Sequence, residues 1–439
     1  MLTNNTYIEM KRFDNTYFVR AGILLVCFGI LFPGFAFSQQ KQLLFLDSCY
    51  KTAREQYPLI KQRDLIEKSR AYTVSNAAKG FLPQLSLSGQ ATYQSAVTEI
   101  DLPIRGVTFP TFSKDQYKAY AELDQTIYDG GAIKYQKEAA TANADIQNQS
   151  LEVDLYALRD RINQVYFGVL LQDEQLKQND LLQKDIKNSI DLIRANVENG
   201  TAIPSSLDEL QAELLLQEQN RLQLVASRKT YLTMLGQFMN RVLPDNIALQ
   251  VPAGLLMQDG VKRPELSLYD SRRKSYDVQD KILNAANRPH LSFFVQGGYG
   301  RPALNLFDNN FDPYYIGGFR FSWALGGMYT LKGQRQLLVV NRQTEDVEKE
   351  TFLFNTKISL TQQQQDIQKL KDLIGKDEEI IVKRVSITAS DKARMENGVI
   401  TVNDYITQLD KEDQAKQNLL LHQVQLLLTQ YNYQTISGN

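Results

Sequence analysis

Apolar and polar residues alternate along four segments of the chain, at about 84–97, 116–128, 290–300 and 314–326. A period of two residues is typical of a β-strand with one apolar and one polar face. Aromatic residues gather toward the ends of these segments, as they do in the strands of membrane β-barrels. An antiparallel sheet packed on a soluble core alternates in the same way, so the pattern by itself leaves both interpretations open.

The spacing of apolar residues becomes helical elsewhere in the chain. From Leu151 to Val197 they recur in steps of three and four, with polar Asn179 and Gln183 in the same register. About 60 helical residues without a proline would extend roughly 90 Å. We expect a first helix at about 46–79 and two long helical hairpins.

The hairpins are predicted at 132–240 and 330–433. They would turn at Asn199-Gly200 and Asn397-Gly398, since asparagine and glycine commonly end helices.

The two sets of elements are related by an internal repeat. Residues 83–87, Pro-Gln-Leu-Ser-Leu, resemble residues 289–293, Pro-His-Leu-Ser-Phe, and Glu-Asn-Gly at 198–200 recurs at 396–398. Several matches share an offset and an order, which independent coincidences would not do. The sequence therefore predicts two structural halves. The first covers 43–250 and the second 251–435, each with the order helix, strand, loop, strand and long helical hairpin.

The N-terminus has the features of a secretory signal. Basic residues precede an apolar stretch at 21–37, and the small residues Ala36 and Ser38 form a cleavage pattern. We interpret 1–38 as a signal peptide. A membrane-anchoring helix is the alternative, and Pro33 within a short stretch counts against it. Cleavage would leave Cys49 as the single cysteine, so no intrachain disulfide is expected and Cys49 should be a small buried helix residue.

Composition narrows the function classes. The 439 residues include 49 Lys+Arg and 50 Asp+Glu, a balance that does not favour nucleic-acid binding. His290 and His422 are too few and too far apart for a histidine-based metal centre. Residues 298–303 imitate a dinucleotide-binding motif, but Pro302 prevents the helix that the motif requires. We therefore expect no enzyme activity, no cofactor and no metal.

Several short motifs together resemble the outer membrane efflux protein family, whose members are TolC-like channels. They are Leu-Pro-Gln-Leu-Ser-Leu at 82–87, Tyr-Asp-Gly-Gly at 128–131, Glu-Asn-Gly at 198–200 and Leu-Asp-Glu-Leu-Gln-Ala-Glu at 207–213. The resemblance implies a mainly α-helical homotrimer in the outer membrane of a Gram-negative cell. Each subunit would add four strands to a 12-stranded β-barrel, and its hairpins would form a long α-helical barrel in the periplasm.

The resemblance also implies a function. The channel would be a passive exit duct for efflux or type I secretion, energised by an inner-membrane pump and a periplasmic adaptor protein. Four strands do not close a barrel, and open strand edges are not tolerated in lipid, so the chain must oligomerise. The alternatives are a trimeric structural or adhesive coiled-coil stalk in the outer membrane without a conducting lumen, and a soluble periplasmic adaptor.

Three groups of residues are candidates for functional roles. Glu122 and Asp124 lie on the polar side of a predicted strand, where three copies would form acidic rings that favour cations. The alternative is that they are ordinary solvated residues of the wall, and Arg320 on the matching strand could partly offset their charge.

The other two groups lie at the hairpin turns. By resemblance, Asp404 matches an acidic position that narrows the periplasmic end of the channel, although Thr407 and Ile400 depart from the family pattern there. Asp404 could instead cap the returning helix. The turns Asn199–Ser206 and Asn397–Asp404 would be the surface on which the adaptor docks.

Overall fold

The computed structural model describes residues 43–98, 112–255, 258, 260–305 and 308–439. The predicted signal peptide, 1–38, lies outside these residues. Leu44–Asn439 form one compact unit, and the fold below is that of this unit. None of the described helices combines the length and the apolar character needed to cross a membrane.

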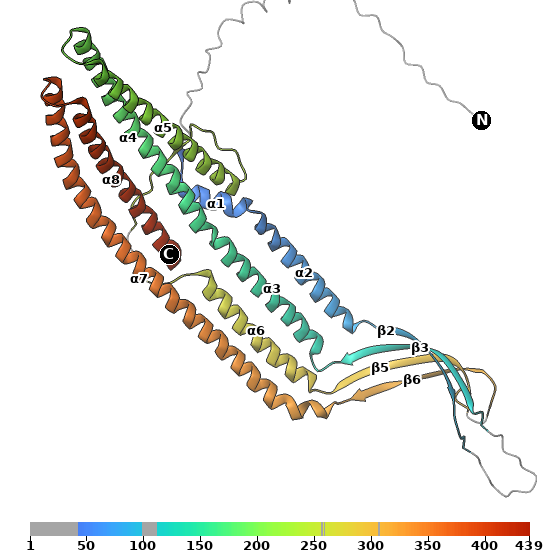
Figure 1. The fold of residues 1–439 in the computed structure, drawn as a ribbon. Coiled ribbons are helices and arrows are strands. Elements are labelled where there is room, and N and C mark those ends of the chain that lie inside the picture. The colour runs from blue at the N-terminus through green and yellow to red at the C-terminus, as the bar shows by residue number, and fades with distance from the viewer. Residues whose placement is uncertain (1–42, 99–111, 256–257, 259, 306–307) are drawn as a thin grey trace, which may run out of the picture. The chain divides into compact units, whose positions relative to one another are not determined.

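Four antiparallel strands form one sheet in the order β2-β3-β5-β6 (Figure 1). They are β2 (Gln84–Tyr93), β3 (Asp115–Tyr128), β5 (His290–Arg301) and β6 (Asp312–Ser322). β2 ends earlier than the predicted 97, and β6 ends earlier than the predicted 326. The chain after β6 turns at once into a short 3-10 segment, Leu325–Gly327, that leads into α7. Two further strands, β1 (Leu43–Leu44) and β4 (Ala248–Leu249), have two residues each.

Eight α-helices make up most of the described part of the chain. They are α1 (Leu46–Gln56), α2 (Gln62–Ala78), α3 (Ala132–Tyr156), α4 (Leu158–Glu198), α5 (Pro204–Phe238), α6 (Pro264–Ala286), α7 (Met328–Glu396) and α8 (Val402–Ser437). α7 alone has 69 residues, which at 1.5 Å per residue is about 100 Å.

The single helix expected at 46–79 is wrong, because the chain breaks at Tyr57-Pro58. Tyr57 has an extended backbone (φ −63°, ψ 132°), since the proline ring that follows disfavours the helical region for the preceding residue. A 3-10 turn, Pro58–Lys61, then leads into α2. Arg263-Pro264 repeats this geometry, with Arg263 extended and Pro264 opening α6. The X-Pro pair therefore marks a helix start in both halves.

The helices pack in two groups within the unit. Nearer the strands, α2 lies on α3, α3 on α6, and α6 on α7 (Figure 1). Toward the other end, α4 and α5 form one hairpin, α7 and α8 form another, and α4 also packs on α8. The strands and the hairpin turns therefore lie at opposite ends of the long helices.

The main core holds α4 against α1 and α8. Leu158 and Ile162 on the predicted helical seam are buried, with 4% and 1% of their surface exposed. Cys49 is buried and free, as predicted, and burial raises the pKa of its thiol to about 12. The hydroxyl of buried Tyr166 lies 2.8 Å from the carbonyl oxygen of Leu44 and 2.7 Å from that of Gln250, so its one proton is shared between them.

Buried amides fix the alignment of the helices. Asn179 and Gln183, predicted in the seam of α4, are buried and bond each other at 2.7 Å. The Asn179 amide also donates to the Gln217 side chain of α5 at 3.0 Å. Farther along α4, Asn163 accepts from Tyr50 of α1 and donates to Thr435 of α8 at 3.2 Å. A sliding helix would leave such buried groups unpaired, so they favour one register.

A second core joins the two hairpins near their turns. Its buried residues come from α4, α5, the end of α7 and the start of α8. They are Leu182, Ile186, Ile190, Ile193, Leu210, Met395, Val402, Tyr405 and Leu409. The two turns are therefore held side by side by apolar packing.

The carboxyl groups of Glu213 on α5 and of Asp410 and Asp413 on α8 lie near one another where these two helices pack together. Burial, and next the carboxylates of Glu213 and Asp413, raise the pKa of Asp410 to about 6. Burial also raises the pKa of Asp413, although Gln178 donates a hydrogen bond to it at 2.9 Å. Like charges at this contact oppose the packing of the hairpins once they are ionised.

We predict that Ile162→Asp will unfold or strongly destabilise the helical region. An unpaired carboxylate in this core should cost about 3–5 kcal/mol, whereas Ile162→Val, the matched control, should cost about 1 kcal/mol. Thermal unfolding of the detergent-solubilised protein, followed by circular dichroism, measures both. Equal melting temperatures for the two variants would contradict the placement of Ile162 in the core.

We predict that Asp410→Asn will stabilise the protein at pH 7 but not at pH 4. The pKa of Asp410 is higher in the folded chain than the ordinary value of about 3.9, so its ionisation opposes folding increasingly as the pH rises from about 4 to about 6. The effect should be of order 1 kcal/mol, because water still reaches the side chain. Melting temperatures across this pH range test it, with exposed Asp208→Asn on α5 as control. A gain that is the same at both pH values would exclude this cause.

Candidate functional site

One face of the sheet is apolar and exposed. The alternating residues that were predicted to share a side are brought together by the strand register, in which Leu85 pairs with Leu123 and Leu123 with Val295. Leu87 and Tyr315 each have 82% of their surface exposed. The large exposed residues of this face are Leu85, Leu87, Tyr93, Tyr117, Leu123, Phe293, Val295, Tyr299, Tyr315, Phe319 and Phe321. An apolar surface that spans four strands marks a contact with lipid or with protein.

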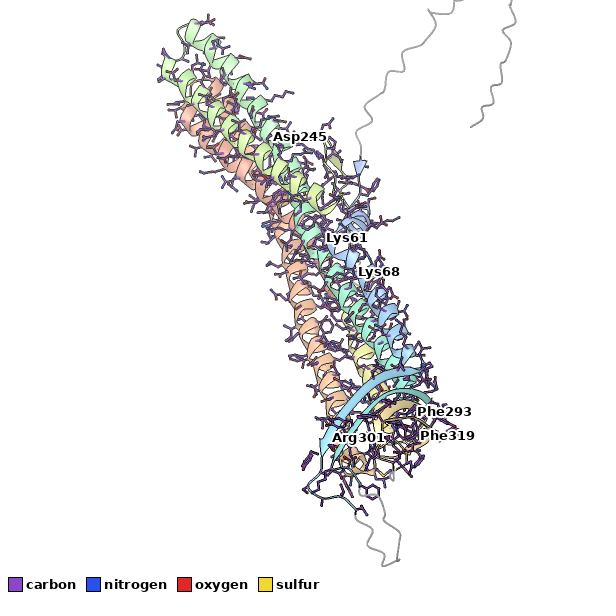
Figure 2. The ribbon with its side chains drawn as sticks, turned by 90° about the vertical axis from the view of Figure 1, so that its right-hand side faces the viewer. Lys61, Lys68, Asp245, Phe293, Arg301 and Phe319 are labelled. Carbon is purple, nitrogen blue, oxygen red and sulfur yellow. The ribbon has the colours of Figure 1, made fainter. Side chains whose placement is uncertain are left out.

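Aromatic side chains mark both ends of this face. Phe293 of β5 and Phe319 of β6 lie side by side nearer the helices, with ring centroids 5.5 Å apart (Figure 2). At the far end, the ring of Tyr299 stacks on that of Phe311 at 5.8 Å, and Tyr117 lies 6.0 Å from the same ring. The aromatic positions expected near the strand ends therefore form two bands.

The two edges of the sheet are open. β2 and β6 each pair with one neighbour, and no other strand of the described residues covers their outer edges. Each edge strand keeps a row of backbone N–H and C=O groups free for pairing.

The opposite face of the sheet is polar and carries Glu122 and Asp124. Arg320 of β6 reaches both, with Nη2 3.0 Å from Glu122 Oε1 and Nη1 3.0 Å from Asp124 Oδ2. The hydroxyl of Ser292 donates to the same Asp124 oxygen at 3.2 Å. The spacing placed the two carboxylates on one face, and the structure adds that a single guanidinium pairs with both.

The two hairpin turns have the same local structure. Gly200 and Gly398 have positive φ angles of 71° and 70°, a conformation that glycine adopts without steric cost. In the first turn, Gly200 N donates to Val197 O and Thr201 N to Asn196 O. In the second, Gly398 N donates to Met395 O and Val399 N to Arg394 O, which completes the same helix-ending motif.

A cavity of about 650 Å³ lies between the two turns. Residues from both hairpins line it, among them Asn196, Gly200, Glu209, Asn397 and Thr401. The structure therefore brings together the two turns that the repeat placed 198 positions apart.

Asp404 caps α8. Its Oδ2 accepts from the backbone N of Thr401 at 3.1 Å, and its own N donates to Thr401 Oγ1 at 3.1 Å. The hydroxyl of Thr401 also donates to the carboxylate, and these bonds hold the pKa of Asp404 below its usual value. Thr401 was not singled out from the sequence, although Thr-x-x-Asp before a helix resembles a capping box.

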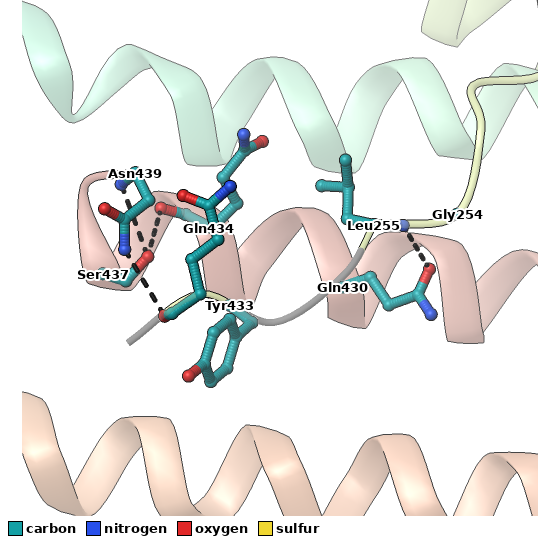
Figure 3. Close-up of a pocket in the computed structure, with 8 residues that line it drawn as sticks. Gly254, Leu255, Gln430, Tyr433, Gln434, Ser437 and Asn439 are labelled. Carbon is teal, nitrogen blue, oxygen red and sulfur yellow. Dashed lines mark hydrogen bonds between the residues drawn. The ribbon is translucent and has the colours of Figure 1, made fainter. Parts of the chain in front are cut away.

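The cavity shown in Figure 3 lies where Gly254 and Leu255, in the connection from β4 to α6, pass over the end of α8. Its volume is about 200 Å³, and Gln430 accepts from the Leu255 backbone N at 3.2 Å. No charged side chain is among its lining residues. We assign it to the packing of this connection on α8.

The two histidines lie on separate elements. His422 of α8 contacts Asp377 of α7, with Nδ1 and Oδ2 2.6 Å apart, and His290 begins β5. Within the described ranges, no group of three or more His, Cys, Asp or Glu side chains is arranged to hold a metal ion.

Comparison with known proteins gives one family match. Residues 49–241 match the family described as outer membrane efflux protein. This range runs from α1 to just beyond α5 and includes β2, β3 and the first turn. No curated protein sequence matches the chain.

Solved structures share the fold over nearly the whole chain. CusC, described as forming a transmembrane channel, has a TM-score of 0.65 and 13% identity, over 89% of this chain and 91% of its own. The outer membrane protein VceC of Vibrio cholerae has a TM-score of 0.62 and 16% identity, over 90% of this chain and 96% of its own. The outer membrane channel MtrE of Neisseria gonorrhoeae, in an open state, has a TM-score of 0.60 and 13% identity, over 89% of this chain and 88% of its own.

At such low identity these structures show the fold, and the family match supplies the class. The family match over residues 49–241 and the shared fold together confirm the resemblance of the chain to the outer membrane efflux protein family of TolC-like channels.

Proposed function

We propose that three copies of this chain form one outer-membrane channel, a passive exit duct for efflux or type I secretion. The observation that carries the proposal is the four-stranded sheet with an exposed apolar face and two open edges. Lipid accommodates the apolar face, but it offers no partner for the edges. Pairing β6 of one copy with β2 of the next would satisfy both requirements.

Three copies of four strands give a barrel of twelve. About eight strands fill their own interior with side chains, whereas sixteen leave an aqueous channel. Twelve strands lie between these cases and leave room for a lumen lined by the polar face. The family resemblance favours three copies over other numbers that would also close the sheet.

The helices would continue the duct into the periplasm. We propose that the repeats cover 43–250 and 251–435, so that each copy adds the α4–α5 and α7–α8 hairpins to one α-helical barrel. The shared core near the turns supports this arrangement, because it aligns both hairpins of a chain. No step in this role is catalytic: a partner inner-membrane pump would supply the energy.

The turns around Asn199-Gly200 and Asn397-Gly398 would meet the periplasmic adaptor. Their matching backbone geometry and the cavity between them support this assignment. Asp404 lies beside the second turn, and three copies would place a ring of carboxylates there. Its capping bonds fix the carboxylate close to the turn. Glu122 and Asp124 would line the lumen at the level of the strands.

The main alternative is a trimeric outer-membrane stalk that has the same helices but no conducting lumen. Two hairpins in each chain favour the duct, because a solid stalk would need only one helix per chain. A soluble adaptor would leave the apolar face of the sheet without a lipid partner.

We predict that the mature protein purified in detergent is a trimer that forms steady ohmic pores in planar lipid bilayers. Asp404→Asn keeps a hydrogen-bond acceptor for Thr401 and removes the charge, so conductance should change while the trimer persists. Mass in detergent and single-channel currents measure the two properties. A trimer that never conducts, with or without Asp404→Asn, would favour the stalk. A water-soluble monomer would rule out the channel.

We predict that Gly200→Val and Gly398→Val will impair export without abolishing the trimer. Nothing lies within 4 Å of a Cβ added at either position, so the strain comes from the backbone, at about 1–2 kcal/mol. Gly375→Val on α7 is the control, since its site is equally open and its φ is not positive. Resistance of cells to exported dyes reports export, and mild-detergent gels report the trimer. Normal export by both turn variants would show that these turns are not docking points.

A further inference from the structure

Arg320 lies across three strands on the polar face of the sheet. It belongs to the edge strand β6, yet its guanidinium reaches Glu122 and Asp124 on β3, with both contacts at 3.0 Å. Between them, the guanidinium carbon lies 4.6 Å from the ring centroid of Phe294 on β5. One side chain therefore makes two ion pairs and a cation–π contact.

The strand register makes this reach possible. Phe294 pairs with Asp124 on one side and with Gly318 on the other. A Cβ at Gly318 would lie 3.4 Å from the Phe294 ring, so glycine leaves space for the ring on which the guanidinium rests. Ser292, the cross-strand partner of Arg320, also bonds Asp124. These contacts fix the position of the Arg320 guanidinium, although half of its side-chain surface is exposed.

The charges of this group can be counted. Two carboxylates and one guanidinium leave one net negative charge per chain, whereas the carboxylates alone would carry two. Farther along this face, Lys118 of β3 and Asp312 of β6 flank Gly300 of β5, so their opposite charges offset each other. Fixed charge along a pore wall attracts oppositely charged ions and repels others, so halving it weakens the preference for cations.

We infer that Arg320 is the residue that sets the charge selectivity of the lumen at the level of the strands, an inference that rests on the proposed channel function. It halves the net negative charge of the group that it forms with Glu122 and Asp124, so the strand region prefers cations only weakly. The acidic ring expected from the sequence is therefore masked in the wild-type chain, and loss of Arg320 exposes it.

The test is the reversal potential of single channels in planar bilayers across a KCl gradient. All variants carry Asp404→Asn, so that the charge of Asp404 does not contribute. Arg320→Gln should raise the permeability ratio of K⁺ to Cl⁻ by about threefold or more. Glu122→Gln combined with Asp124→Asn should shift it toward Cl⁻, because the group then keeps only the positive charge of Arg320.

Arg320→Lys separates charge from structure. It keeps the positive charge but loses the two-pronged geometry, so selectivity should stay close to that of the parent if charge is the cause. If Arg320 only tied the strands together, Arg320→Gln and Arg320→Lys would both lower the trimer yield and leave the reversal potential of the remaining channels unchanged. That result, or equal reversal potentials in Arg320→Gln and its parent, would overturn the inference while leaving the channel intact. Absence of conduction by the parent would overturn the proposed function instead.

Discussion

Backbone groups at the edge of a β-sheet need hydrogen-bond partners, and the interior of a lipid bilayer supplies none. The sheet of this chain exposes an apolar face across four strands and leaves β2 and β6 open. The apolar face is suited to contact with lipid, but an isolated copy would bring the unpaired backbone groups of its two edges into the bilayer. The proposed assembly through the edges would satisfy both requirements, and the proposed roles of the long helices and of the lumen depend on it.

The helical part follows a different constraint, because long helices with a repeating apolar seam can slide past one another. Amides buried in the seam oppose this sliding. Asn179, Gln183 and Gln217 bond one another between α4 and α5, and Asn163 joins α4 to α1 and α8. Each hydrogen bond contributes little net stability when it is formed, but breaking it leaves a buried polar group unpaired, which costs more free energy. The carboxyls around Asp410 act in the opposite sense, since their repulsion weakens the contact between the hairpins as they ionise.

Charged residues in the candidate site are mostly engaged in local structure. Asp404 closes a capping box with Thr401, so its carboxylate stabilises the start of α8 and at the same time fixes negative charge beside the turn. Glu122 and Asp124 are both paired with Arg320. A residue that lines a duct can therefore have a structural partner within its own chain, and its effect on permeating ions depends on that partner.

The sequence by itself determined the alternation of the strands, the seam of the helices, the glycine turns and the order in which these elements occur twice. These features depend on local periodicity and on backbone conformations that few residues adopt, such as the positive φ of Gly200 and Gly398. The sequence analysis missed the helix break at Tyr57-Pro58, because apolar residues at helical spacing continue across it. Only the tertiary structure decided that one guanidinium on β6 pairs with two carboxylates on β3, and that the two turns enclose one cavity. Such contacts join residues nearly 200 positions apart, and they depend on the pairing of strands and the packing of helices, which no local pattern specifies.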